Sequence, residues 1–533
     1  GTVRLTWLDG SDPAPAGGTR AVTRYDVRVS TATITLTNFA TATTVTTTAA
    51  PGMPGAANQT DITGLRLGQQ YWVAVRAIDR AGLVSSTIAT VGPVSIDLVR
   101  DTVTDVPASL GTDVSGGFDV NGDAYADVVV GSGITASTWG GVARVYFGSA
   151  TGISATRYAE FRGVSANRFG SSAVSLGDVN GDGIGDIAVG EPGPTSLTAL
   201  APGAVYIYFG RRAWNPPTTP YGAGNADVVL EGGTGEFATA SLGVSLARVG
   251  DFNGDGFNDI AAGAPQANSS RGAVIVVFGR TTFPATIAPA AADVVIRNSS
   301  TETLFGRALA GGGRLVGGDT REDLAVGYGA ASSNGFVAVF AGRAAMTPAA
   351  LTLADAALNR AGVATTPANL GQFAVGGVGD INGDGRSDLA IGTAVRGPGQ
   401  VALYFGDASG GLTAGPVITS PSTTDSDVFG IRIGSITAPT FVRPSLLLAS
   451  PSGADLLVGA SAYLGNDPRA YIFLGRASWT GLTVLNAESS VVLSGAASQP
   501  VSGLNWIGDV DGDGYVDAAV GRASGAGTMI VVR

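Results

Sequence analysis

From about residue 107 to the C-terminus, the sequence alternates short apolar segments with glycine-rich polar segments. One apolar segment, 203–210, reads Gly-Ala-Val-Tyr-Ile-Tyr-Phe-Gly, and its counterparts occupy 141–148, 272–279, 335–342, 399–406 and 470–475. Short apolar runs bounded by glycine are typical of buried β-strands. No apolar run approaches the roughly 18 residues of a transmembrane helix. The pattern therefore predicts an all-β protein of many short strands.

The predicted strands fall into a unit that recurs seven times. Six of the units open with an aromatic residue or Leu followed by Gly, at 110–111, 169–170, 242–243, 305–306, 370–371 and 429–430. An acidic loop, a short apolar run and two further apolar segments follow, so each unit predicts four strands. Repetition of a four-stranded unit around an axis protects the sheet edges. We therefore expect a seven-bladed β-propeller over residues 96–533.

Five of the units carry an acidic loop with the pattern Asp-x-Asn/Asp-x-Asp-Gly-x-x-Asp. Gly stands at position six in four copies, where it suits a sharp turn, and Ala124 replaces it in the first. Positions one, three, five and nine offer side-chain oxygens, and position seven offers its backbone carbonyl. The expected ligands are Asp119, Asn121, Asp123, Tyr125 and Asp127; Asp178, Asn180, Asp182, Ile184 and Asp186; Asp251, Asn253, Asp255, Phe257 and Asp259; Asp380, Asn382, Asp384, Arg386 and Asp388; and Asp509, Asp511, Asp513, Tyr515 and Asp517.

An all-oxygen ligand set at this spacing favours calcium, and we expect about five Ca²⁺ ions. The five loops crowd 16 Asp into small spaces, where like charges repel without a cation. An EF-hand requires a Glu at position twelve, whereas that position is apolar here: Val130, Val189, Ala262, Ile391 and Val520. The alternative that the loops are plain Asp/Asn/Gly turns without metal stays open.

Two further units have degenerate acidic loops. The unit 315–327 keeps Asp319 and Asp323 but has Leu315 and Gly317 at the first two ligand positions. The other unit contains 429–430 and 455–459 and has lost its acidic loop. Whether these two units have a role is open at this point.

These motifs resemble the FG-GAP repeat family, which includes the β-propellers of integrin α-subunits. The Phe-Gly openings, the acidic loops and the Gly263-Ala264-Pro265 segment carry the resemblance, which covers most of the chain. It implies that the calcium loops lie on the face opposite the ligand and that the ions are structural. It also implies adhesion or recognition of a protein or glycan.

Residues 1–95 differ from the rest, because they are richer in Thr and carry no acidic loop. Polar and apolar residues alternate over 2–7 and 24–30, as in half-buried strands. Together with Trp7, Leu65, Leu67 and Tyr71, these strands resemble a fibronectin type III module whose first strand is missing. We therefore expect the natural protein to extend further N-terminally. We also expect residues 95–100 to supply the fourth strand of the last blade, beside 529–533.

The composition excludes several functions. The chain has no Cys, His or Lys, so thiol nucleophiles, imidazole bases and Schiff-base lysines are absent. A carboxylate-only enzyme such as a glycosidase remains possible, but no spare carboxylate pair marks an active site. A net charge of −11 disfavours nucleic-acid partners. The absence of Lys and Cys suggests a bacterium with GC-rich DNA.

The sequence thus favours a non-catalytic, secreted or cell-surface binding protein, with a protein or glycan ligand. The candidate contacts are the segments 191–202 and 211–225, with Trp139, Trp214 and Tyr221. For each aromatic side chain, a packed loop residue is the alternative. Two other functions stay open: an architectural subunit of a bacterial surface assembly or appendage, with neighbouring subunits as partners, and accessory domains of a larger secreted hydrolase.

Overall fold

The chain forms two compact units, Gly1–Val99 and most of Arg100–Arg533, which are described separately. The computed structural model describes residues 3–8, 12–13, 19–20, 22–47, 51, 57–62, 70–79, 84–85, 87–95, 100–103, 111–133, 140–163, 167–194, 201–329, 335–344, 349–361, 370–393, 399–419, 427–434, 454–462, 469–473, 475–479, 491–494, 501–512, 514, 516–522 and 528–532.

The first unit contains two facing sheets and a small hairpin. The sheets have the strand orders β1-β6 and β5-β4-β7-β8, and β2 pairs with β3. The elements are β1 (Val3–Leu8), β2 (Asp12–Pro13), β3 (Thr19–Arg20), β4 (Val22–Ser30), η1 (Phe39–Thr41), β5 (Thr43–Val45), β6 (Ala57–Ile62), β7 (Gln70–Asp79) and β8 (Ala89–Ser95).

The core of the first unit lies between the two larger sheets. Val27 and Val73 are buried there, and Trp7 packs edge-on against Tyr25 with ring centroids 5.1 Å apart. Alternate residues of β4 point to this core, as the two-residue period of the sequence predicts.

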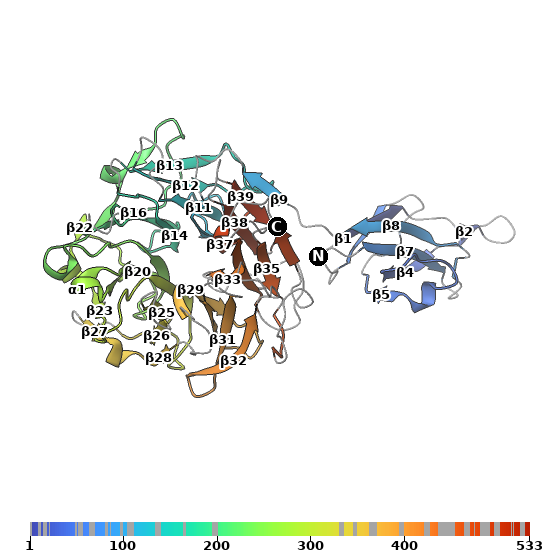
Figure 1. Cartoon of the computed structure of the whole chain (residues 1–533). Coiled ribbons are helices and arrows are strands. Elements are labelled where there is room, and N and C mark those ends of the chain that lie inside the picture. The colour runs from blue at the N-terminus through green and yellow to red at the C-terminus, as the bar shows by residue number, and fades with distance from the viewer. Residues whose placement is uncertain are drawn as a thin grey trace. The chain divides into compact units, whose positions relative to one another are not determined.

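The second unit holds seven sheets in its described residues, named here sheets 1 to 7 in chain order. Each sheet is built on four antiparallel strands, and sheet 7 takes its outer strand from the N-terminal side. Figure 1 shows the sheets following one another around a common centre. The all-β class predicted from the sequence is therefore confirmed.

The strand bounds follow the repeated unit. Sheet 1 is β10 (Asp113–Phe118), β11 (Asp127–Ser132), β12 (Val142–Tyr146) and β13 (Tyr158–Arg162); sheet 2 is β14 (Ser172–Gly177), β15 (Asp186–Glu191), β16 (Ala204–Tyr208) and β18 (Val228–Glu231); sheet 3 is β19 (Leu246–Gly250), β20 (Asp259–Ala264), β21 (Ala273–Val277) and β23 (Val294–Arg297); sheet 4 is β24 (Ala308–Gly313), β25 (Asp323–Tyr328), β26 (Phe336–Phe340) and β28 (Leu358–Ala361).

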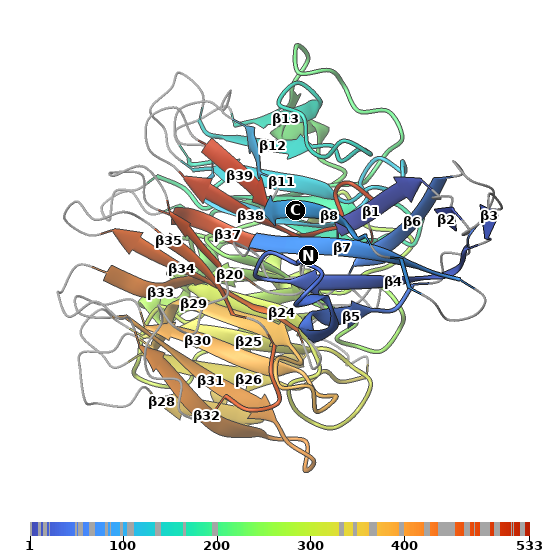
Figure 2. The same cartoon turned by 90° about the vertical axis from the view of Figure 1, so that its right-hand side faces the viewer.

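The remaining sheets keep the same order, which Figure 2 shows from the side for β29 to β32. Sheet 5 is β29 (Leu370–Gly379), β30 (Asp388–Thr393), β31 (Gln400–Gly406) and β32 (Leu412–Thr419); sheet 6 is β33 (Asp427–Ile433), β34 (Leu456–Ala462), β35 (Arg469–Phe473) and β36 (Val491–Ser494); sheet 7 is β37 (Val501–Gly508), β38 (Asp517–Arg522), β39 (Thr528–Val532) and β9 (Arg100–Val103).

Three additional short strands extend sheets 1 to 3, a feature that the sequence did not predict. Each lies between the third and fourth strands of the following sheet and pairs in parallel with the outer strand: β17 (Tyr221–Gly222) with β13, β22 (Thr286–Ile287) with β18, and β27 (Ala349–Thr352) with β23. The short helical turns are η2 (Ala223–Asn225), η3 (Gly235–Phe237), α1 (Ala267–Ser270), η4 (Pro289–Ala291) and η5 (Leu353–Asp355).

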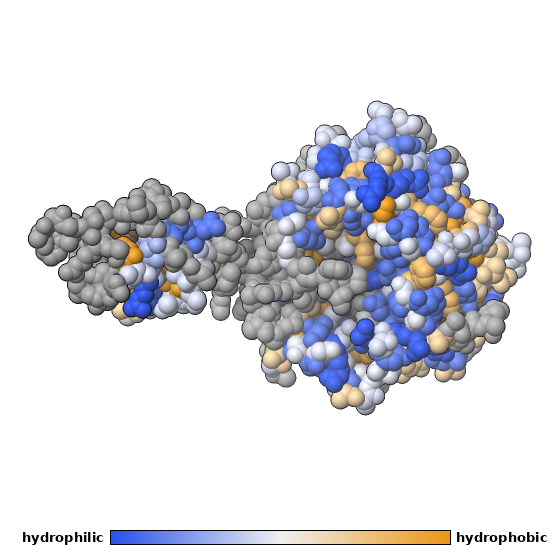
Figure 3. All heavy atoms as spheres, turned by 180° about the vertical axis from the view of Figure 1, so that it is seen from behind, coloured by the Kyte–Doolittle hydropathy of each residue, from blue (hydrophilic) through white to orange (hydrophobic). Residues whose placement is uncertain are grey.

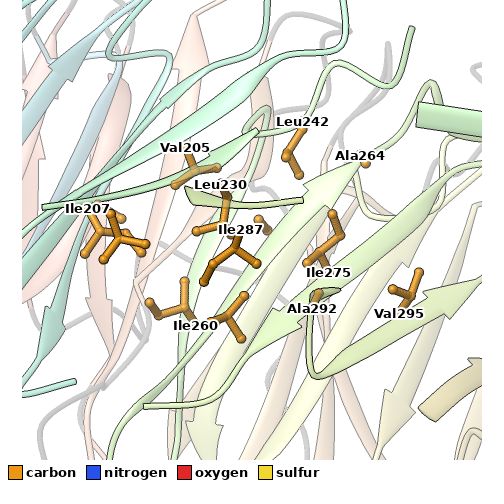
Figure 4. Close-up of a cluster of buried hydrophobic side chains, with 14 of the residues drawn as sticks. Val205, Ile207, Leu230, Leu242, Ile260, Ala264, Ile275, Ile287, Ala292 and Val295 are labelled. Atoms are coloured by element: carbon orange, nitrogen blue, oxygen red, sulfur yellow. The ribbon is translucent and has the colours of Figure 1, made fainter. Parts of the chain in front are cut away.

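The first strand of each sheet contacts the first strand of the next, in the order β10, β14, β19, β24, β29, β33 and β37. The series is closed, because β37 also contacts β10. Hydrophobic side chains fill the space between neighbouring sheets, as Figure 4 shows for Val205 and Ile207 of sheet 2 facing Ile260 and Ile275 of sheet 3.

The strand that completes sheet 7 is β9, which pairs antiparallel with β39 through Arg100↔Val532 and Val103↔Met529. The predicted segment, 95–100, is therefore wrong in its bounds, because Ser95 ends β8 of the first unit. The predicted source of the strand, the chain on the N-terminal side of the repeats, is correct.

None of the helices in the described part of the chain has the length and hydropathy needed to cross a lipid bilayer.

Candidate metal centres

Each intact acidic loop connects the first and second strands of its sheet. The loop 119–127 joins β10 to β11, and the ninth-position Asp of every intact loop is the first residue of the second strand. Four of the loops are described completely, whereas Asp513 and Tyr515 of the fifth lie outside the described residues.

The first Asp of each loop folds the backbone around its own carboxylate. Its Oδ1 accepts the position-four N–H at 2.6 Å in all five loops, from Gly122, Gly181, Gly254, Gly383 and Gly512. Its Oδ2 accepts the position-six N–H at 2.6 to 2.9 Å, from Ala124, Gly183, Gly256, Gly385 and Gly514. The described parts of the five loops therefore share this pair of hydrogen bonds.

Positions three and five continue the same pattern, for example in the second loop. Asn180 Oδ1 accepts the N–H of Asp182 at 2.9 Å, and Asp182 Oδ1 accepts the N–H of Ile184 at 2.9 Å. The Nδ2 of Asn180 donates to Asp182 Oδ2 at 3.1 Å. Equivalent bonds hold the loops beginning at Asp119, Asp251 and Asp380. Positions one, three and five are thus fixed on the inside of one turn.

This donor set fits calcium, because every side chain that it brings together offers oxygen. In the fifth loop, one carboxylate oxygen from each of Asp509, Asp511 and Asp517 lies within 4.8 Å of the others. Three carboxylates at this separation repel one another unless a cation lies between them.

Glycine at positions four and six is required by backbone geometry. In the second loop, φ is 81° at Gly181 and 84° at Gly183, a left-handed conformation that side chains disfavour. In the first loop, Ala124 adopts φ 75° at position six, so this loop carries local strain.

The ninth Asp has a second role that the sequence interpretation missed. It is 0–1% exposed in all seven units, including the degenerate ones that contain Asp323 and Asp455. In the fourth unit, Asp323 Oδ2 accepts the N–H of Val316 at 2.7 Å and Oδ1 accepts that of Gly342 at 2.8 Å. The Oδ1 bond, from the N–H of a Gly at or just after the end of the third strand, occurs in six units for Asp127, Asp186, Asp259, Asp323, Asp388 and Asp455. The persistence of this Asp in degenerate units was the signal in the sequence.

Burial governs the ionisation of this buried Asp. It raises the pKa to about 7 for Asp186, Asp323 and Asp388 and to about 8 for Asp259, although the backbone N–H donors lower it. Neighbouring carboxylates at positions one and five raise the pKa of Asp186 and Asp388 further. These acidic groups therefore belong to the interior of the sheets as well as to the loops.

The degenerate fourth loop has a positively charged side chain, Arg321, beside its remaining Asp319. Arg321 Nη1 lies 2.8 Å from Asp319 Oδ2, and its Nε donates to the carbonyl of Asn253 in the third loop at 3.4 Å. Leu315, at position one, is 2% exposed within an apolar cluster. A buried apolar side chain therefore replaces the first ligand.

Two of the aromatic side chains expected to contact a ligand, Trp214 and Tyr221, pack against the protein. Trp214 Nε1 donates to the carbonyl of Val120 at 3.0 Å, and Tyr221 is 6% exposed and stacked on Phe161 at 5.2 Å. Tyr221 belongs to the buried cluster between sheets 1 and 2, and Trp214 is partly buried against it. Trp139 and residues 195–200 of the segment 191–202 lie outside the described residues.

Two segments of the chain, residues 169–208 in sheet 2 and 243–277 in sheet 3, match the FG-GAP repeat. The chain is also similar to integrin alpha-4 of Xenopus laevis, with 33% identity over 156 residues, 28% of this chain and 14% of that protein. It is 32% identical over 176 residues to phosphatidylinositol-glycan-specific phospholipase D of Bos taurus, which covers 32% of this chain and 20% of that protein.

The chain thus spans a fifth or less of the length of these two relatives. Among solved structures, one titled "Structure of Dos1 propeller" aligns with a TM-score of 0.39 and 10% identity, covering 82% of this chain and 95% of that chain. The predicted resemblance to FG-GAP repeats and integrin α-subunits is confirmed for the matched segments.

Proposed function

We propose that this chain is a non-catalytic, calcium-stabilised extracellular binding protein whose seven sheets are the blades of a β-propeller. The closed order of contacts among the first strands supports the propeller. The strand orders β1-β6 and β5-β4-β7-β8 support a fibronectin type III-like domain at residues 1–95.

The calcium proposal rests on one shared hydrogen bond. In all five loops, the Oδ1 of the first Asp accepts the N–H of the Gly at position four. A repeated turn that gathers only oxygen donors is what calcium binding requires. Bound calcium would supply the positive charge that holds the convergent carboxylates together.

Recognition is assigned to the face opposite these loops, where the second and third strands of each sheet are connected. Integrin similarity supports adhesion to a protein or glycan. Figure 3 shows hydrophilic residues interspersed with smaller hydrophobic areas on one face of the second unit, and Val417 is the one exposed large hydrophobic side chain among the described residues of this unit.

A second candidate is an accessory unit of a secreted hydrolase, which the similarity to a phospholipase D favours. In this case the reaction would belong to another part of a longer protein. A third candidate, an architectural subunit of a bacterial surface assembly, rests on the repeated fold alone.

The decisive experiment is thermal unfolding of the full chain in calcium and in excess EGTA, with elemental analysis of the same sample. Because a ligand bound only by the native state stabilises it, we expect Tm to rise by many degrees in calcium, with about five ions per chain. A metal-free protein whose Tm is the same in calcium and in EGTA would contradict the proposal.

A further inference from the structure

Each intact acidic loop is hydrogen bonded to the following sheet through the carbonyl of its first Asp. The donor is the N–H that precedes the ninth-position Asp of the next sheet. The five bonds are Gly185 to Asp119 at 2.8 Å, Asn258 to Asp178 at 3.4 Å, Glu322 to Asp251 at 3.1 Å, Ala454 to Asp380 at 2.5 Å and Ala126 to Asp509 at 3.0 Å.

A second bond accompanies each of these. The carbonyl at position two accepts the N–H of the residue three places after the third strand of the next sheet, directly after the Gly that donates to the ninth Asp. The pairs are Arg211 to Val120 at 3.1 Å, Arg280 to Val179 at 2.9 Å, Arg343 to Phe252 at 2.8 Å, Arg476 to Ile381 at 2.9 Å and Ser149 to Val510 at 3.0 Å. Both bonds therefore occur at all five intact loops.

Side chains close the same junctions. A Cβ on Gly512 would lie 2.9 Å from Tyr125 Cε1, and a Cβ on Gly181 would lie 2.6 Å from Phe257 Cε1. In both cases the position-seven side chain of one loop covers the position-four Gly of the preceding loop. At these two junctions, a change in the conformation of one loop would therefore alter its contacts with the next sheet.

We propose that calcium in each intact loop fixes the junction with the following sheet, and that the loop 509–517 is the clasp that closes the ring of sheets. The inference rests on the proposed calcium binding. The first Asp links the two effects, because its carboxylate is a ligand while its carbonyl holds the neighbouring sheet.

The junction of sheets 7 and 1 is the one where this coupling matters most. It joins the last sheet of the chain to the first. Among the described residues, its loop is the one in which three carboxylate oxygens converge within 4.8 Å. Without a cation, repulsion would displace Asp509, and its carbonyl would move away from Ala126.

The test is hydrogen–deuterium exchange of the full chain in calcium, read at single amides by mass spectrometry with electron-transfer fragmentation. The variant is Asp511→Ala, which removes one ligand side chain from the 509–517 loop and leaves the bonding carbonyls of Asp509 and Val510 in place. Exchange at Ala126 and Ser149 of sheet 1 should accelerate by roughly ten-fold or more, with one calcium lost per chain.

Asn180→Ala is the matched control in the second loop. It should accelerate exchange at Asn258 and Arg280 of sheet 3 and leave Ala126 and Ser149 at wild-type rates. Wild-type protein in EGTA should show acceleration at both junctions, which covers the case in which a variant folds poorly.

Acceleration confined to residues 501–522 in Asp511→Ala would overturn the clasp while leaving calcium binding intact. Exchange unaffected by calcium anywhere, with no metal in elemental analysis, would overturn calcium binding itself and the clasp with it.

Discussion

At the residue scale, Ala124 is the one residue at positions four and six of the intact loops that is not Gly, although its backbone is left-handed. Its φ of 75° is left-handed, and side chains disfavour this region by roughly 1–2 kcal/mol. Ala124→Gly should therefore raise the free energy of unfolding by about 1 kcal/mol, measured by urea denaturation in calcium.

The equivalent glycine of the second loop is the matched control. A Cβ at Gly183 would meet no atom within 4 Å, so Gly183→Ala adds backbone strain without a clash. We expect it to lower the stability by about 1 kcal/mol. The same sign of change in both variants would show that position six is not governed by φ.

The buried ninth Asp supports a second residue-level prediction. Asp323→Asn keeps one carbonyl oxygen but turns an NH₂ group toward either Val316 N–H or Gly342 N–H. One buried donor is left without an acceptor, and the stability should fall by about 1–3 kcal/mol.

Because the fourth loop has lost its first ligands, the loss caused by Asp323→Asn should be equal in calcium and in EGTA. Urea denaturation in both conditions provides the measurement. A loss that appears only in calcium would mean that the fourth unit binds metal after all.

The spacing of Asp and Asn was enough to predict that positions one, three and five lie together in the four fully described loops. It could not separate the two functions of the ninth position, since ligand and backbone acceptor are both filled by Asp. Only the placement of Gly148, Gly210 and their equivalents opposite this carboxylate distinguishes them. These glycines are about twenty residues away in sequence.

At the element scale, the short strands β17, β22 and β27 cover the outer edges of sheets 1 to 3. Strands of two to four residues have too few positions for a periodic pattern, so the sequence could not reveal them. Their parallel pairing also joins segments that no tight hairpin connects.

Ile287 of β22 tests the contribution of these strands. It is 4% exposed and lies in the cluster between sheets 2 and 3, so Ile287→Ala should cost about 2–4 kcal/mol of stability. Its neighbour Thr286 is exposed on the same strand, and Thr286→Ala should change the stability by less than about 0.5 kcal/mol. Similar losses in the two variants would argue against an anchoring role for β22.

At the scale of the whole molecule, the sequence predicted that the chain before the repeats completes the last sheet, but placed the strand at 95–100 instead of Arg100–Val103. The apolar run Ile96-Asp-Leu-Val reads more strongly as a strand than Arg100-Asp-Thr-Val. The register with β39 decides instead, and pattern alone cannot show it.

Two truncations test the closing strand. Removal of residues 1–95 keeps β9 and should leave the unfolding transition of the second unit in place. Removal of residues 1–103 exposes the edge of β39, and we expect a lower Tm together with aggregation in light scattering. Identical behaviour of the two truncated chains would mean that β9 adds nothing to the fold.

The pairing of Arg100 with Val532 also bears on how the chain is synthesised. β9 leaves the ribosome long before β39, so the ring cannot close until nearly the entire repeat region has been translated. Contacts of such high sequence separation form slowly and leave strand edges exposed meanwhile. Until the last residues are translated, sheets 1 to 6 of the nascent chain must therefore remain folded without a closed ring. The pairing of β39 with β9 then completes sheet 7 and closes the ring.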